Sequence, residues 1–84
     1  MKIEEIIRIA KEYNEEYNSK DLQKIVYVVY DGYDDIVKLV CKSKKEAFSR
    51  INEGASYGDY IDEYKIIEVD LIEDDARRIY WQTR

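Results

Sequence analysis

A chain of 84 residues has room for one small core, so we expect a single domain over residues 1–84. Its 45% hydrophobic content is too high for a disordered protein, and its net charge of −5 argues against direct binding to polyanionic nucleic acid. The absence of histidine removes the commonest general base, and the single cysteine excludes an internal disulfide. A lone cysteine fits a reducing cytoplasm, where we expect the protein, and no apolar run approaches the ~20 residues of a membrane span.

The N-terminal half predicts a helix followed by a β-hairpin. Residues 2–18 place apolar side chains at the i, i+3, i+4 and i+7 spacing of one helical face. Residues 24–30 read KIVYVVY, a short run of β-branched and aromatic side chains that favours a strand. Asp31-Gly32 begins a turn, and a second apolar run over 36–42 predicts the partner strand.

A capping box opens the second predicted helix. The Ser43 hydroxyl is placed to accept a hydrogen bond from the Glu46 amide, and the Glu46 carboxylate can reach back to the Ser43 amide. We expect this helix over 44–53, with Gly54 as its C-terminal stop and a loop over 55–60.

The C-terminal third contains one predicted strand and one element with two interpretations. Apolar side chains alternate along 63–72, which predicts a third strand, and a turn should follow at 73–76. The last segment is interpreted either as a fourth strand over 77–83 or as a helical turn over 75–82.

This order of elements predicts an α+β domain with the layout α-β-β-α-β-β. The sheet should contain three or four antiparallel strands in the order 2-1-3-4, because the edge beside the first strand is free to receive the third. Both helices are expected on one face of the sheet. The predicted core comprises Ile6, Ala10, Ile25, Tyr27, Val29, Val37, Leu39, Phe48, Ile51, Ile67 and Val69.

No cluster of residues carries a catalytic or metal-binding signature. Cys41 alternates with apolar residues on the second strand, so we expect a buried, unreactive thiol. The acids within 31–35 lack the spacing of a calcium-binding loop, and the consecutive acids 73–75 project in different directions. We therefore expect no catalytic residue, no metal ion and no cofactor. A small basic patch is interpreted as solvated surface that could contact an anion: Lys42, Lys44, Lys45 and Arg50.

The main functional signal is a concentration of acid between Glu53 and Asp75. This stretch holds nine carboxylates against one lysine, and three tyrosines lie among them. Carboxylates attract cationic surfaces over a distance, and tyrosines supply rigid contact area with a hydroxyl group. The candidate partner-binding residues are Tyr57, Asp59, Tyr60, Asp62, Glu63, Tyr64, Glu73, Asp74 and Asp75. The alternative is an acidic, solubilising face without a partner.

A set of structural positions also points to a family. The hairpin contains Val26-Tyr27-Val28-Val29 and the Asp31-Gly32 turn, and the helix opens with Ser43-Lys44-Lys45-Glu46-Ala47 after Val40. In these positions the segment from Ile25 to Asp70 resembles a family of small uncharacterised proteins of phages and AT-rich bacteria. The resemblance implies a hairpin and a capped helix, with no catalytic residues to carry over. In being small, acidic, tyrosine-rich and histidine-free, the chain also resembles phage anti-defence proteins such as anti-CRISPRs, which often imitate nucleic acid.

We therefore expect a non-enzymatic inhibitor or adaptor that binds a basic or nucleic-acid-handling site on a host or defence-system protein. In this hypothesis the loop before the third strand supplies the anchor, and the acids at 73–75 add long-range attraction. We expect no direct nucleic-acid binding and no membrane contact, and a monomer or homodimer in the cytoplasm of the host cell. The alternative is an intracellular interaction module that self-associates or pairs through a sheet edge.

Overall fold

The computed structural model describes residues 1–58 and 61–81. Within these residues, two helices and four strands follow one another in the predicted order α-β-β-α-β-β. They are α1 (Ile3–Tyr17), β1 (Ile25–Asp31), β2 (Ile36–Cys41), α2 (Lys44–Ser56), β3 (Tyr64–Asp70) and β4 (Asp75–Trp81). The last element is therefore a strand, which decides between the two interpretations of the C-terminal segment.

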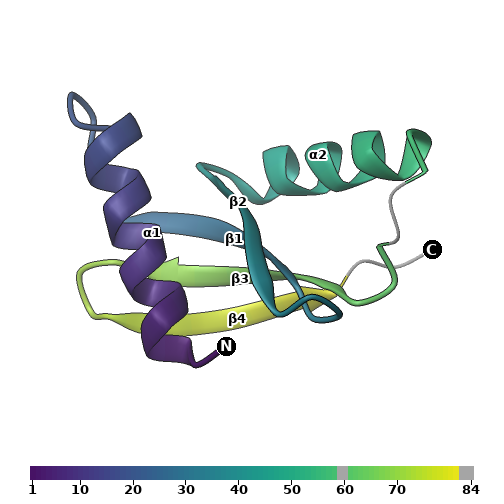
Figure 1. Cartoon of the computed structure of the whole chain (residues 1–84). Helices are drawn as coiled ribbons and strands as arrows, with labels where there is room; N and C mark the ends of the chain where they lie inside the picture. Colours follow the sequence, from purple (N-terminus) through teal and green to yellow (C-terminus); the bar gives the residue numbers. More distant parts are fainter. Residues whose placement is uncertain (59–60, 82–84) are drawn as a thin grey trace.

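The strands form one antiparallel sheet in the predicted order β2-β1-β3-β4 (Figure 1). The helix α2 carries the chain from the outer strand β2 past β1, and β3 then pairs with the free edge of β1. β1 and β3 are the central strands, and their register places Asp31 opposite Tyr64. The β1–β2 turn and the start of β3 therefore lie at the same end of the sheet.

The two helices pack on opposite faces of the sheet, so the prediction that both cover one face is wrong. On the α1 face, Ile6 packs in one cluster with Val28 of β1 and Ile67 of β3. On the α2 face, a second cluster joins Val29 and Ile66, the neighbours of those two strand residues. Adjacent residues of a strand point to opposite faces. The central strands are apolar on both faces, and one face could not have covered both sets of side chains.

The two-sided packing also explains where the core prediction succeeded and failed. It is confirmed for Ile6, Ala10, Val29, Ile51, Ile67 and Val69, which are buried. It is only partly met by Ile25, Tyr27, Val37, Leu39 and Phe48, which are half-buried. It missed the fully buried Val26, Val28 and Ile66, because both helices were expected on one face of the sheet. The thiol of Cys41 is buried, as predicted.

α2 begins after Ser43 as predicted, but the Glu46 carboxylate bonds to the amide of Lys42 instead of the predicted Ser43 amide, and the helix ends later than predicted. The Ser43 hydroxyl accepts a hydrogen bond from the Glu46 amide at 3.1 Å, while the Glu46 carboxylate accepts from the amide of Lys42 at 3.4 Å. Gly54 is not the stop, because the helix continues to Ser56. Gly58 follows the end of the helix, and its φ of 92° lies in the left-handed region that glycine adopts without a steric penalty.

The two β-hairpins share one design, although the sequence shows no obvious repeat. β1 and β3 each end in an aspartate, Asp31 and Asp70, whose carboxylate accepts hydrogen bonds from the backbone amides two and three residues further on. Each four-residue turn ends in a second aspartate at positive φ, 56° for Asp35 and 53° for Asp74. Aspartate tolerates this conformation better than most residues and stabilises turns through its carboxylate. Several acids of this acidic chain therefore specify turns.

Candidate functional site

A hydrogen bond joins the β1–β2 turn to the segment that precedes β3. The amide of Gly32 donates to the carbonyl oxygen of Glu63 at 2.9 Å. A Cβ atom at position 32 would lie 3.0 Å from that oxygen, so any larger residue would crowd the contact unless the backbone shifted by a few tenths of an ångström. The junction gathers acids from two separate parts of the sequence at one end of the sheet. We call this the turn-end surface and define it by Tyr33, Asp34, Asp35, Asp62 and Glu63, all of which are exposed.

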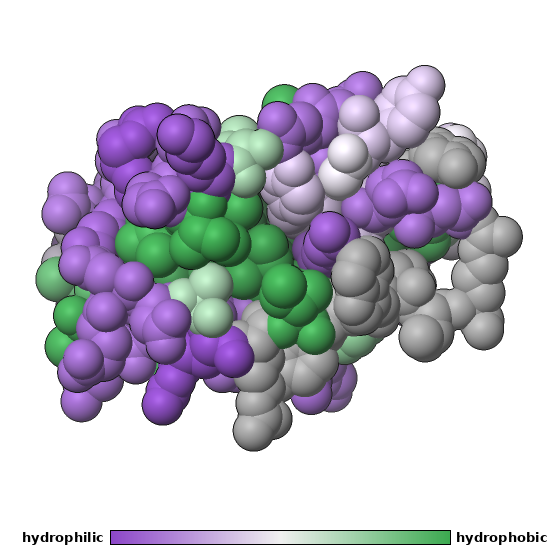
Figure 2. All heavy atoms as spheres, turned by 90° about the horizontal axis from the view of Figure 1, so that it is seen from below, coloured by the Kyte–Doolittle hydropathy of each residue, from purple (hydrophilic) through white to green (hydrophobic). Residues whose placement is uncertain are grey.

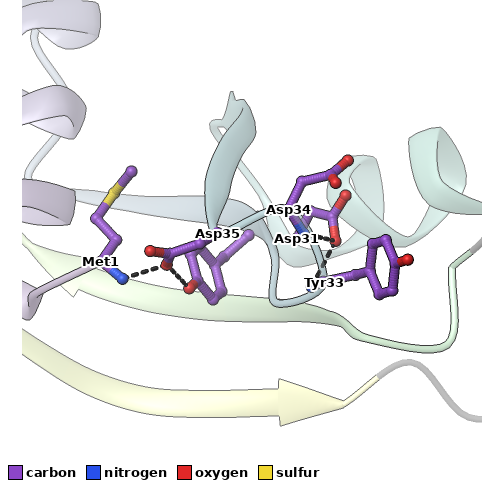
Figure 3. Close-up of polar contacts among 6 residues, drawn as sticks. Met1, Asp31, Tyr33, Asp34 and Asp35 are labelled. Carbon is purple, nitrogen blue, oxygen red and sulfur yellow. Dashed lines mark hydrogen bonds and ion pairs between the residues drawn. The ribbon is translucent and has the colours of Figure 1, made fainter.

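The turn is held from inside by the buried carboxylate of Asp31. Its Oδ1 atom accepts from the amides of Tyr33 at 2.9 Å and Asp34 at 3.3 Å (Figure 3). The carboxylate of Asp31 is thereby occupied by the turn. Tyr33 is 75% exposed, which is far more than a tyrosine of the core.

Asp35 has its own polar partners. Its Oδ1 atom accepts hydrogen bonds from the ammonium group of Met1 and from the hydroxyl of Tyr30 (Figure 3). These two contacts, the ammonium first, lower the pKa of Asp35. The hydrogen bond to Asp35 in turn raises the pKa of Tyr30 to about 12. The ammonium group therefore offsets part of the negative charge that Asp35 adds to the turn-end surface.

The partner-binding residues predicted around the loop before β3 differ in their exposure to solvent. Tyr57 is 84% exposed at the end of α2, and Asp62 and Glu63 are exposed as well. Tyr64 is only 7% exposed and belongs to the core cluster on the α2 face. Its assignment as a contact residue is therefore wrong. The first residue of β3 points toward α2 rather than toward solvent. Asp59 and Tyr60 lie outside the described residues.

The second predicted patch lies at the other end of β3 (Figure 1). Glu73, Asp74 and Asp75 are all exposed there. The carboxylate of Asp74 forms an ion pair with the ammonium group of Lys11 on α1. This pairing offsets part of the patch's charge, so its long-range attraction should be weaker than the count of acids suggests.

Asp70 belongs to the same end but has a structural role. Hydrogen bonds to its carboxylate from the backbone amides of Glu73, foremost, and Ile72 lower its pKa, and the Arg77 guanidinium 3.5 Å away acts in the same direction. Burial opposes these contributions. Asp70 thus stabilises the β3–β4 turn as a charged group.

Sequence reasoning missed the contribution of Tyr33, Asp34 and Asp35 to the candidate site. The signal was present, because the predicted sheet order already placed the end of the first strand beside the start of the third. Combining that order with the acidic turn would have brought 33–35 next to Asp62 and Glu63.

Two further findings bear on the class of site. In the described ranges 1–58 and 61–81, no three carboxylate or thiol side chains come close enough together to hold a metal ion. Across those same residues, neither helix has the length and apolar character needed to cross a bilayer.

Comparisons with models of known protein families, with curated proteins and with solved structures found no match.

Proposed function

We propose that this chain is a non-enzymatic binding protein, an inhibitor or adaptor, that docks its turn-end surface on a basic site of another protein. The observation that carries the proposal is the hydrogen bond from Gly32 to Glu63. It fixes two acidic segments in one position, so the surface is organised before binding. A preorganised surface loses less conformational entropy on association than a mobile one.

Exposed tyrosines add contact area to this charge. Tyr33 lies within the turn-end surface, and the exposed Tyr57 lies at the end of α2. Tyrosine is enriched among the residues that dominate binding energy at protein interfaces. We propose that the tyrosines anchor the complex, while the carboxylates steer the encounter and select a cationic partner.

The partner class that fits this surface is a protein with a cationic groove that handles nucleic acid, such as a defence nuclease. Carboxylates on a rigid edge offer such a groove negative charge in place of phosphates. The resemblance to phage anti-defence proteins in size, acidity and tyrosine content supports the same class.

Capture from a host lysate with a matched pair of variants tests the proposal. In the turn-end variant, Asp34, Asp62 and Glu63 are all changed to lysine. In the control variant, the exposed α1 acids Glu12, Glu15 and Glu16 are changed to lysine, which alters the net charge by the same amount.

A protein captured by the wild-type chain should be retained by the α1 control and lost by the turn-end variant. Equal loss from both variants would mean that only net charge matters. Retention by both would remove the turn-end surface from consideration. Thermal melting monitored by circular dichroism verifies that each variant is folded.

One observation favours a second candidate, self-association through a sheet edge. Ile79 on the outer strand β4 is 50% exposed. Figure 2 views the molecule from the β4 side and shows a group of hydrophobic residues surrounded by hydrophilic ones. Both outer strands, however, contain a register shift that leaves a basic residue, Lys38 on β2 and Arg77 on β4, without an opposing residue. Bulges and positive charges of this kind protect edges from pairing. A stable dimer at low concentration in light-scattering measurements would favour the edge over the turn-end surface.

A further inference from the structure

A groove of about 320 Å³ lies between α2 and the sheet, and its lining is unusual for this acidic chain. Its apolar lining comes from Val29, Leu39 and Ile51. The basic side chains of Lys38 on β2 and Arg50 on α2 line it as well. The volume is at the lower end of the range for small-molecule sites, about 300–1,000 Å³. A groove with an apolar lining and two cations suits a small ligand with both apolar and anionic parts.

The groove is also lined by a buried tyrosine whose hydroxyl has no hydrogen-bond partner among the described residues. Tyr64 lines it and is 93% buried, yet its hydroxyl forms no hydrogen bond to any residue in the described part of the chain. Buried tyrosine hydroxyls usually have a hydrogen-bond partner, because an unsatisfied buried polar group is costly. The hydroxyl is therefore available to donate to a ligand in the groove.

Lys38 and Arg50 are also available to contact a ligand in the groove. Among the described residues, neither Lys38 nor Arg50 forms an ion pair. Glu53 is the one acid that lines the groove within that part of the chain, so these three residues leave an excess of one positive charge. Arginine recognises planar oxyanions through two parallel hydrogen bonds, and lysine adds a point charge.

We propose that this groove binds a small organic anion with an apolar body. The carboxylate or phosphate of the ligand is held by Arg50 and Lys38 and accepts a hydrogen bond from the Tyr64 hydroxyl. The apolar body covers Leu39 and Ile51. The inference does not depend on the turn-end surface, and its test uses no residue assigned to that surface or to its anchors.

The test is a titration of the full chain with two anions and with their neutral counterparts. Binding is monitored through the amide chemical shifts in nuclear magnetic resonance spectra. The probes are adenosine monophosphate against adenosine, and indole-3-acetate against indole-3-acetamide. At least one anion should shift the amides of Lys38, Leu39 and Ile51, and its neutral counterpart should not. The anion that binds more tightly identifies phosphate or carboxylate as the preferred group.

Four single substitutions then assign the contacts. Arg50→Gln and Lys38→Gln should each weaken binding of that anion by about tenfold, and Tyr64→Phe by about fivefold, as expected for lost hydrogen bonds to a charged group. Tyr64→Phe should leave the melting temperature unchanged or raise it, because the hydroxyl has no hydrogen-bond partner among the described residues. Lys45→Gln, an exposed change outside the groove, should have no effect on binding. The inference is overturned if neither anion shifts the groove amides, if the neutral counterparts bind equally well, or if Lys45→Gln weakens binding as much as Lys38→Gln.

Discussion

The packing of helices on both faces of the sheet makes a sharp prediction about two adjacent residues of β1. Val28 is 0% exposed and belongs to the cluster under α1, whereas Val29 is 1% exposed and belongs to the cluster under α2. We expect Val28→Thr and Val29→Thr to destabilise the protein to a similar extent. A sheet covered on one face only would leave one of the two substitutions nearly neutral.

The expected size of the effect follows from the chemistry of the substitution. Threonine has nearly the shape of valine, so no cavity forms, but one methyl group becomes a hydroxyl. Burying a hydroxyl without a hydrogen-bond partner costs roughly 1–3 kcal/mol. Losing the favourable burial of one methyl group adds about 0.8 kcal/mol. Each variant should therefore lose about 2–4 kcal/mol. The whole domain has a free energy of unfolding on the order of 4–13 kcal/mol, at ~0.05–0.15 kcal/mol per residue.

Urea unfolding followed by circular dichroism measures both losses with the same probe. Ile72→Thr, in the exposed β3–β4 turn, is the control and should change stability by less than about 0.5 kcal/mol. A Val28→Thr or Val29→Thr protein with wild-type stability would refute the two-sided core.

Three further predictions concern the turns and the core. Gly32→Ala should lower the melting temperature and shift the amide resonances near Glu63, because the added Cβ would press on that residue's carbonyl oxygen. Asp70 has a lowered pKa, due foremost to its hydrogen bond from the Glu73 amide. The contribution of Asp70 to the free energy of unfolding should thus be complete above the pKa of an aspartate in the unfolded chain, about 3.9, and should disappear as pH falls through the lowered pKa. In urea titrations, the difference in stability between the wild type and Asp70→Asn should therefore vanish at acid pH. Ile66→Ala should cost about 2–5 kcal/mol and Phe48→Ala less, since Ile66 is fully buried and Phe48 half-buried; the reverse ranking would contradict the burial pattern.

Local patterns were sufficient to predict the elements and their order. The Ser43 cap, the β-branched run at 24–30 and the Asp31-Gly32 turn each depend on residues close together in sequence, so local physics determines them. The sheet order followed from these elements and the rules of connection. The C-terminal strand stayed ambiguous because its pairing with β3 is a tertiary contact.

Tertiary packing decided the features that sequence reasoning missed. The residues Val28 and Val29 are both apolar, and only the placement of a helix on each face shows that both are buried. Tyr64 was predicted as a contact residue beside Asp62 and Glu63, but the first residue of β3 faces α2 and is buried. The acids at 31 and 70 specify turns rather than a binding surface, which depends on hydrogen bonds that composition does not reveal.

The most direct test of the turn-end surface is the salt dependence of association with a captured partner. Biosensor measurements would compare the wild-type chain with the variant in which Asp34, Asp62 and Glu63 are changed to lysine. For the wild type, the association rate should fall about tenfold or more from low salt to about 0.3 M, because screening weakens steering by exposed carboxylates. The variant should associate slowly at every salt concentration. A variant that keeps both the wild-type rate and its salt dependence would contradict the assignment of binding to this surface.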